Sequence, residues 1–322
     1  MSSSKKLKIL NDILGDCYYS GKEHLFHCPR CEHHKRKLSI NIEKNVFKCW
    51  VCDWSGRDIY RLVRRYGTHS SRGKWKEFFN RVEIESFADK MFGSKEIIGE
   101  QEISLPEEFV SLANKNLPAT SLYPMNYLYD RGIKKEDIVR WKIGFCAEGE
   151  YEGRVIIPSF GISGKPNYFV ARSYSRNWKK YMNPAASKDI VFNHLYLDFD
   201  DDMILVEGAF DAITAGPNAV PILGSTLREN SKLFQQIIKN DAPIYVALDT
   251  DAESKALRII SNLLKYDLEV YKVDIHPFLD AGEMTKKEFR ERKQNATLMN
   301  STSYLLTVSY THLRAHETGR NL

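Results

Sequence analysis

The sequence has no long hydrophobic run. Its apolar segments are of strand length, much shorter than the roughly 20 residues that a membrane-spanning helix needs. The amino terminus, Met-Ser-Ser-Ser-Lys-Lys, also lacks the hydrophobic core of a secretory signal peptide. We therefore expect a protein that does not cross a membrane and that works in a reducing cytoplasm.

The sequence also lacks the phosphate-binding loop of many ATPases, Gly-x-x-x-x-Gly-Lys-[Ser/Thr]. The nearest approach is Gly161-Ile-Ser-Gly164-Lys165, which has the wrong spacing and is followed by Pro166. A fused helicase or ATPase is therefore not expected in this sequence.

Cysteine is scarce, with six residues in 322, and four of them fall in two close pairs. In a reducing compartment such pairs favour metal binding over disulfides. Cys28-Pro-Arg-Cys31 and Cys49-Trp-Val-Cys52 are separated by 17 residues, a spacing typical of zinc sites with two Cys-x-x-Cys turns. The other two cysteines, Cys17 and Cys146, are expected to be small buried residues.

The zinc predicted at Cys28, Cys31, Cys49 and Cys52 should be structural. Four thiolates fill a tetrahedral shell and leave no position for a reacting water. The segments 37–42 and 45–48 alternate like a hairpin that brings the two cysteine pairs together. Three nearby histidines are expected to stay outside the coordination shell: His27, His33 and His34.

Charge is unevenly distributed along the chain. Residues 1–81 carry 18 Lys and Arg against 8 Asp and Glu, so this segment is +10, whereas the whole chain is +5. A basic amino-terminal unit joined to a more acidic remainder suggests that the first part holds a polyanion. Basic residues of the cysteine-containing segment alternate with Phe47, Trp50 and Trp54, rings that could stack on bases or pack over the zinc turns.

Two short apolar runs end in carboxylates. Residues 203–206 lead into Glu207, Gly208 and Asp211, and residues 244–248 lead into Asp249 and Asp251. Parallel strands present functional groups at their carboxyl ends, where several acids would repel one another unless a cation lay between them. Mg²⁺ is the natural candidate because it prefers hard oxygen ligands. Asp211 could bind metal or cap the helix that follows.

Between the cysteines and the acids, the pattern predicts several elements. A helix with Ile59, Leu62 and Val63 on its apolar side and arginines facing outward should follow the ribbon. A flexible boundary is expected at 67–73, followed by a linking helix that contains Trp75, Phe78, Phe79, Val82 and Phe87. Helices near 126–132 and 134–141 and strands at 153–158 and 168–172 should come next.

The order of these motifs resembles DnaG-type primases, particularly those of bacteriophages. The resemblance covers about residues 25–290. It rests on the four-cysteine ribbon, on Tyr127-Leu128-x-x-Arg131-Gly132, and on Gly153-Arg154, Arg172 and Lys180-Tyr181-x-Asn183. It is completed by the acidic motifs, which are similar to the Toprim signature. Two features depart from the pattern: Ala252-Glu253 stands where Ala-Gly is common, and Leu279-Asp280-Ala-Gly-Glu283 matches the last acidic motif only loosely.

The resemblance implies an α/β protein with an amino-terminal zinc ribbon and a Toprim-containing core around a mostly parallel sheet. It implies synthesis of short RNA primers on single-stranded DNA by nucleotidyl transfer. Two Mg²⁺ ions would be bound by Glu207, Asp249 and Asp251, with Asp211 and Asp280 in support. Nucleotide or template would be bound by Arg154, Arg172, Lys180, Tyr181 and Asn183. The expected partners are single-stranded DNA, ribonucleoside triphosphates and a separate replicative helicase, in a host cytoplasm if the chain is phage-encoded.

Two other classes share part of this pattern. A Toprim nuclease would use the same acids to transfer the phosphoryl group to water. A non-catalytic recombination mediator of the RecR type also combines four cysteines with a Toprim fold. The motif block from Arg154 to Asn183 argues against the nuclease, and the roughly 150 residues between ribbon and acids argue against the mediator.

The expected domain organisation follows from these motifs. We assign residues 1–66 to a template-binding zinc ribbon, 67–104 to a linker with a helix, 105–200 to the amino-terminal part of the core and 201–290 to the Toprim part. Residues 291–322 form a tail. Its end from about Val308 has the character of translated adaptor sequence and is expected to be partly non-native.

Overall fold

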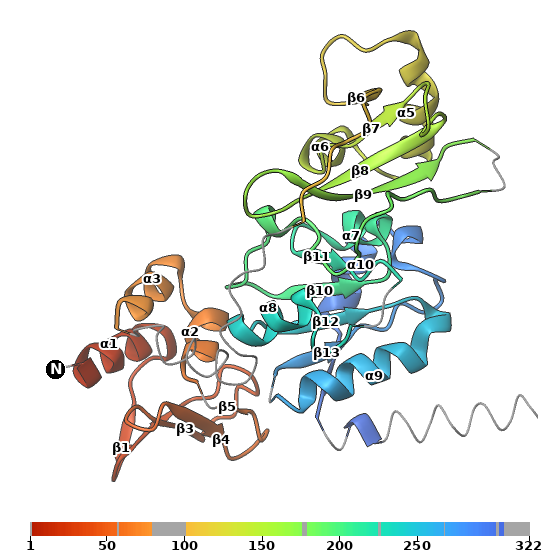
Figure 1. Ribbon diagram of the computed structural model, residues 1–322. Coiled ribbons are helices and arrows are strands. Elements are labelled where there is room, and N and C mark those ends of the chain that lie inside the picture. The colour runs from red at the N-terminus through yellow and green to blue at the C-terminus, as the bar shows by residue number, and fades with distance from the viewer. Residues whose placement is uncertain are drawn as a thin grey trace, which may run out of the picture. The chain divides into compact units, whose positions relative to one another are not determined.

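The computed structural model describes residues 2–56, 58–78, 101–175, 179–224, 227–266, 268–300 and 303–305 (Figure 1). The chain divides into two compact units, Met1–Ser94 and Lys95–Leu322, and each is considered by itself. Several expectations fall outside the described residues: Phe79, Val82 and Phe87 of the linking helix, and the tail from residue 306 onward.

The first unit contains the predicted ribbon. Its five-stranded antiparallel sheet has the strand order β1-β2-β3-β4-β5. The strands are β1 Tyr18–Ser20, β2 Glu23–Phe26, β3 Leu38–Asn41, β4 Val46–Cys49 and β5 Ser55–Gly56. The predicted hairpin is confirmed as β3 and β4, which pair from Leu38 opposite Cys49 to Asn41 opposite Val46.

Three helices complete this unit: α1 Ser2–Leu14, α2 Tyr60–Tyr66 and α3 His69–Phe78. The predicted apolar side of α2 is confirmed, because Ile59, Leu62 and Val63 are fully buried. The expectation that the arginines of α2 face outward is wrong for Arg64, which is 3% exposed.

The flexible boundary expected at 67–73 is not what the structure has. Most of this segment belongs to α3, which packs on α1 and α2. Trp75 on α3 is fully buried in the same hydrophobic cluster as Leu10 of α1 and Phe26 of the ribbon. The first unit therefore includes α3, because the indole is needed to complete its core.

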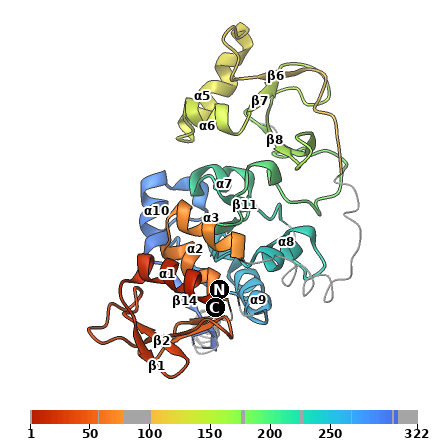
Figure 2. The same cartoon turned by 90° about the vertical axis from the view of Figure 1, so that its left-hand side faces the viewer.

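The second unit begins with an antiparallel four-stranded sheet of order β6-β7-β8-β9. Its strands are β6 Phe109–Ser111, β7 Gly144–Cys146, β8 Arg154–Phe160 and β9 Pro166–Ser173. Between β6 and β7 lie η1 Ala119–Ser121, α5 Leu122–Asp130 and α6 Lys135–Arg140, and Figures 1 and 2 show both α-helices beside this sheet. The predicted helices and strands are confirmed here, and Gly132 after α5 has the positive φ of +72° that favours glycine.

The second sheet is the predicted mostly parallel one. Its order is β11-β10-β12-β13-β14, and only the last pair is antiparallel (Figure 1). The strands are β10 Met203–Val206, β11 Ala219–Pro221, β12 Ile244–Ala247, β13 Val270–Lys272 and β14 Thr297–Met299. All residues of β10 and β12 are buried, as expected when helices cover both faces of a parallel sheet.

The connections of this sheet explain where its helices lie. The chain steps from β10 outward to β11 and then back across to β12 and β13, so right-handed crossovers place α7 on one face and α8 and α9 on the other. The helices and short turns of this region are η2 His194–Tyr196, α7 Ala209–Ala215, α8 Lys232–Asn240, η3 Thr250–Ala252, α9 Glu253–Leu264, η4 Ala281–Glu283 and α10 Lys286–Gln294. The strand order reverses between β10 and β12, where open parallel sheets commonly bind ligands.

The expected tail boundary at residue 291 differs from the structure. Helix α10 continues to Gln294, and β14 pairs with β13 through residues 297–299. Met299 is 3% exposed and belongs to the main core. None of the described helices is long and apolar enough to cross a membrane.

Candidate active site

Neighbouring parallel strands bring two of the predicted acids to one edge of the sheet. Val206 at the end of β10 pairs with Ala247 at the end of β12, so Glu207 and Asp249 follow at nearly the same level. A third segment reaches this edge, because Thr250 N donates to the carbonyl of Leu279 at 3.0 Å. Backbone pairing thus places Asp280, in the next position, near acids that precede it by 31 to 73 residues in the sequence.

Asp211 connects two segments of the chain at this edge through hydrogen bonds. One carboxylate oxygen, Oδ2, accepts from Gly208 N at 2.8 Å and caps α7, while Oδ1 accepts from Gly282 N at 2.9 Å. The residue is 8% exposed, and burial together with the nearby Asp280 raises its pKa to about 6. The capping alternative left open by the sequence is therefore present in the structure. The link to Gly282 was not predicted, because nothing in the sequence pairs two residues 71 positions apart.

Asp249 has the environment of a functional acid. Burial raises its pKa to about 7, and the charges of Asp211, Glu207, Asp280 and Asp251 act in the same direction. Its Oδ1 is buried and has no hydrogen-bond partner. The repulsion shows that these carboxylates lie close enough to interact, as the strand-end pattern predicted.

Asp251 is more accessible than Asp249, whereas Asp280 is half-buried like Asp249. Asp251 is exposed within η3, the short turn that leads into α9. Asp280 is half-buried and caps η4, accepting from Glu283 N at 3.0 Å. Both side chains therefore remain at least partly open to solvent at the mouth of the acidic edge.

Glu207 is paired with a cation that the sequence did not reveal. Its Oε1 lies 2.6 Å from Nζ of Lys255, which extends from the first turn of α9. Its other oxygen, Oε2, is buried without a hydrogen-bond partner. The partner lies 48 residues further along the chain, and only the crossover from β12 to α9 brings it to Glu207. The sequence shows a lysine at this helix start, but no sequence pattern indicates that its side chain contacts Glu207.

The acidic edge fits a divalent cation chemically. Buried oxygens without donors, as on Glu207 and Asp249, are costly unless a cation or a bound group satisfies them. Carboxylate oxygens are also the ligands that Mg²⁺ prefers. Among the described residues, the acids do not form a closed cluster like that of the cysteines.

The predicted basic residues lie around the end of β9. Arg172 donates to the hydroxyl of Tyr181, and its guanidinium carbon lies 4.8 Å from the centre of the Tyr181 ring. The Nε of Arg172 is buried and has no hydrogen-bond partner. Burial raises the pKa of Tyr181 most strongly, while Arg172 lowers it and the charge of Asp211 raises it. That influence of Asp211 shows that this basic group adjoins the acidic edge.

The other predicted contact residues have different positions. Arg154 is 4% exposed and donates to the carbonyl of Lys179 at 3.1 Å, so it holds the loop that carries the basic motif. Asn183 accepts from Ala171 N at 3.1 Å and fixes the same loop to β9. Lys180 is exposed. Of the five predicted side chains, Lys180 and Tyr181 are exposed, Arg172 and Asn183 are half-buried, and Arg154 is buried.

Two residues outside the predicted site join the arginine group to the acids. The guanidinium carbons of Arg131 and Arg172 lie 5.1 and 5.4 Å from the ring centre of Phe210, which directly precedes Asp211. Arg131 also lies 5.0 Å from the ring centre of Tyr127 on α5. Cation–π contacts of this kind hold guanidinium groups without using their N–H donors. Arg131 was visible in the Tyr127-Leu128-x-x-Arg131-Gly132 motif, whereas Phe210 gave no signal beyond its apolar character.

In the first unit, the four predicted cysteines form one cluster. The Sγ atoms of Cys28, Cys31, Cys49 and Cys52 all lie within 4.8 Å of one another, which fits a single tetrahedral zinc ion. Cys146 is buried as expected, whereas Cys17 is only partly buried. His27 instead makes a 3.3 Å contact through Nδ1 with the carbonyl of His33.

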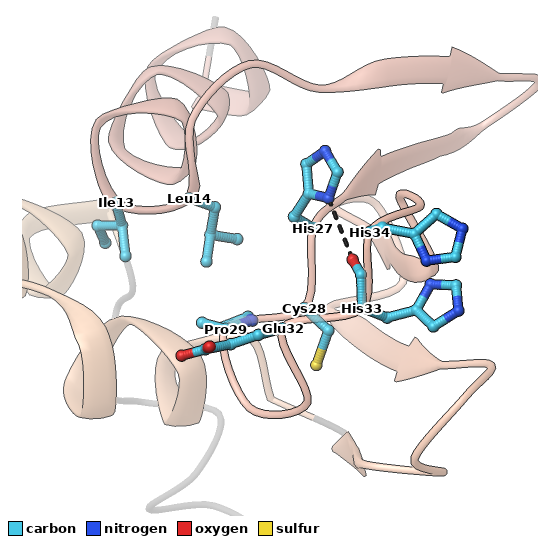
Figure 3. Close-up of a pocket in the computed structure, with 8 residues that line it drawn as sticks. All are labelled: Ile13, Leu14, His27, Cys28, Pro29, Glu32, His33 and His34. Carbon is cyan, nitrogen blue, oxygen red and sulfur yellow. Dashed lines mark hydrogen bonds between the residues drawn. The ribbon is translucent and has the colours of Figure 1, made fainter.

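A pocket of about 340 Å³ opens beside the zinc-binding turn of this unit (Figure 3). It is lined by Ile13, Leu14, His27, Cys28, Pro29, Glu32, His33 and His34. Figure 3 shows Ile13 and Leu14 extending from the end of α1 on one side, with the histidines on the other.

The three rings that could stack on bases or pack over the zinc turns separate into two groups. Trp50 is 66% exposed, and Nζ of Lys48 lies 4.8 Å from its ring centre. Phe47 and Trp54 are 2% and 5% exposed and pack on each other in the core. For these two rings the packing alternative holds, because the small ribbon needs them to cover its zinc turns.

Comparison with known proteins gives relatives of one kind. No protein-family model matches the chain. The chain is 22% identical over 323 residues to the DNA primase of Thermotoga maritima, covering 86% of this chain and 56% of the relative. It is 23% identical over 345 residues to the DNA primase of Clostridium acetobutylicum, covering 89% and 57%. The chain thus spans a little over half the length of these curated relatives.

Solved structures agree with these relatives. The zinc-binding and RNA polymerase domains of the Aquifex aeolicus primase match 97% of this chain and 87% of that chain, with a TM-score of 0.50 and 18% identity. A DnaG primase catalytic domain bound to single-stranded DNA matches 60% of this chain and 76% of that chain, with a TM-score of 0.51 and 16% identity. The predicted similarity to DnaG-type primases is confirmed, and the chain has the fold of their zinc-binding and RNA polymerase domains.

Proposed function

We propose that this chain is a DNA primase that synthesises short RNA primers on single-stranded DNA. The observation that carries the proposal is the acidic edge of the mostly parallel sheet. There, Glu207 and Asp249 each hold a buried carboxylate oxygen without a partner, next to arginines held by Phe210. An acidic edge that needs a cation beside a basic group suited to phosphates is what nucleotidyl transfer requires.

Each side of this edge has its own part in the reaction. Glu207 and Asp249, with Asp251 and Asp280, would bind two Mg²⁺ ions. The ions would activate the attacking 3′-hydroxyl and neutralise the leaving pyrophosphate. Asp211 keeps the Asp280 turn in place through its hydrogen bond to Gly282. Arg131 and Arg172 would contact phosphate oxygens with the N–H groups that remain, because cation–π contacts with Phe210 help to hold both guanidinium groups and Arg172 uses one N–H on the hydroxyl of Tyr181.

The first unit would hold the template. Its basic character and the exposed pair of Lys48 and Trp50 suit a single strand, since the ammonium can contact phosphates while the indole stacks on a base. The zinc ion would keep β3 and β4 in register. We also propose that the chain works with a separate replicative helicase in the cytoplasm and that it is of bacteriophage origin.

Matched acid variants test the role of the edge. Asp249→Asn should abolish primer synthesis on single-stranded DNA, while DNA affinity stays within about twofold of wild type because the ribbon is untouched. Asp201→Asn is the control, since Asp201 is exposed in the turn before β10. It should keep full activity.

Two outcomes would contradict the assignment. Equal loss of synthesis and DNA binding in Asp249→Asn would show that Asp249 is structural. Mg²⁺-dependent nicking of DNA by the wild-type chain in the absence of nucleotides, without any primer product, would instead favour the nuclease alternative.

A further inference from the structure

Lys255 occupies an unusual place for a lysine. It is the third residue of the twelve-residue helix α9, in the first turn, where the helix dipole is positive and a cation is unfavourable. Local helix energetics therefore argue against a lysine at this position. The first turn of α9 also carries Glu253, which does suit the dipole.

The contact with Glu207 accounts for this placement. Nζ of Lys255 lies 2.6 Å from Oε1 of Glu207, and both side chains are shielded, with 22% and 24% exposure. Glu207 is one of the acids whose mutual repulsion raises the pKa of Asp249. Within the described residues, Lys255 is the cation in ion-pair contact with this acidic edge.

The ammonium group and a divalent metal cannot both hold the same oxygen of Glu207 at full strength. Lys255 Nζ takes Oε1, while the buried Oε2 has no partner. A metal that binds through both oxygens of Glu207 has to displace the ammonium, whereas a metal that binds through Oε2 alone would still be repelled by a positive charge next to it.

We propose that Lys255 is a built-in counter-cation of the acidic edge, which holds Glu207 when no metal is bound and competes with divalent cations for it. This inference rests on the metal-binding role of Glu207 in the proposed function. Its consequence is that binding of a metal in the absence of nucleotide is weakened, so that the metal ions bind most readily together with a triphosphate that brings its own oxygen ligands.

The test measures Mn²⁺ binding to the full-length, zinc-loaded chain without nucleotide, by electron paramagnetic resonance of the free ion. Lys255→Met keeps the length of the side chain and removes the charge. Its dissociation constant for Mn²⁺ should be lower than that of the wild type by about fivefold, the value of one partly shielded ion pair. Lys255→Arg keeps the charge and should stay near the wild type.

Lys272→Met is the matched control. Lys272 pairs with Glu253 at 3.1 Å, with side-chain exposures of 23% and 33%, so this pair resembles the Lys255–Glu207 pair but does not include an acid of the proposed metal site. Its removal should leave the Mn²⁺ affinity unchanged. Glu207→Gln should weaken binding, and adding Lys255→Met to it should raise the affinity by clearly less than in the wild type, because the competition for Glu207 is then gone and only the repulsion by the nearby charge is removed.

The outcomes separate this inference from the proposed function. Unchanged or weaker Mn²⁺ binding in Lys255→Met would overturn the counter-cation role, because a lysine that merely orients Glu207 for the metal would help binding. An equal gain in Lys272→Met would overturn it as well, since the effect would then be one of net charge. If the wild-type chain binds no Mn²⁺ at all, the proposed metal site fails and the inference fails with it.

Discussion

At the scale of single residues, the acidic edge is a costly arrangement for the metal-free protein. Asp249 has a pKa of about 7, raised by burial and by four neighbouring acids. An aspartate in an unfolded chain has a pKa of about 3.9. Between about pH 4 and pH 7, the carboxyl group of Asp249 therefore stays protonated in the folded chain, whereas it is ionised in the unfolded chain.

This difference predicts how stability depends on pH. Since the folded state binds more protons than the unfolded state between about pH 4 and pH 7, the contribution of Asp249 to stability falls as pH rises through that interval. Asp249→Asn removes this cost. Without added divalent cations, the variant should be more stable than the wild type near pH 8 by about 1–2 kcal/mol, a figure reduced for solvent screening.

Urea denaturation of both proteins near pH 4 and near pH 8 measures the effect. The gain should be much smaller near pH 4, because Asp249 is then protonated in the folded wild type and only begins to ionise in the unfolded chain. A variant that is less stable than the wild type at both pH values would show that the carboxylate of Asp249 makes a stabilising contact.

At the scale of elements, the most specific feature is the attachment of η4 to α7. Gly282 donates to Asp211, and a Cβ at Gly282 would lie 2.9 Å from Oδ1 of Asp211 and 3.1 Å from Oδ1 of Asp280. Gly282→Ala should therefore push η4 away from α7 and lower the free energy of unfolding by about 1–2 kcal/mol. Thermal or urea unfolding measures the loss.

A double-mutant cycle checks the cause. In an Asp211→Ala background the carboxylate is absent, so the added methyl group has room and Gly282→Ala should cost much less than in the wild type. Equal costs in both backgrounds would mean that the glycine is needed for a reason other than contact with Asp211.

The zinc cluster fixes the ribbon in a similar way. Cys49 ends β4 and is fully buried, so Cys49→Ser should lose bound zinc and unfold the β3–β4 hairpin. Zinc content and the dispersion of amide signals in this unit measure both effects. Cys17→Ser is the control, because Cys17 lies outside the cluster and should keep one zinc per chain. Full zinc retention in Cys49→Ser would disprove the ligand set.

At the scale of the whole molecule, the sequence was most informative where the chemistry is local. Cysteine spacing identified the zinc cluster, and apolar runs that end in carboxylates identified the edge of the parallel sheet. Side-chain contacts between distant segments were not accessible. The Glu207–Lys255 pair and the Asp211–Gly282 hydrogen bond join residues that are 48 and 71 positions apart in the sequence, and no local pattern encodes them.

The end of the first unit differs from the boundary predicted at 67–73 for a related reason. The sequence between Gly67 and Gly73 has the composition of a turn, yet tertiary packing overrides this preference when Trp75 enters the core beside Leu10. No role was predicted for helix α1, because the residues that it packs against lie in the ribbon and in α3. Burial of Phe47 and Trp54 follows from the same need for apolar volume in a small unit.

We propose that this chain makes primers on a template. The most direct measurement is incubation of the wild-type protein with mixed-sequence single-stranded DNA, labelled ribonucleoside triphosphates and Mg²⁺, with resolution of the products by length. We expect short RNA products that need both template and Mg²⁺ and that start without a supplied primer. Absence of any such product from folded, zinc-loaded protein on templates covering every start trinucleotide would contradict it.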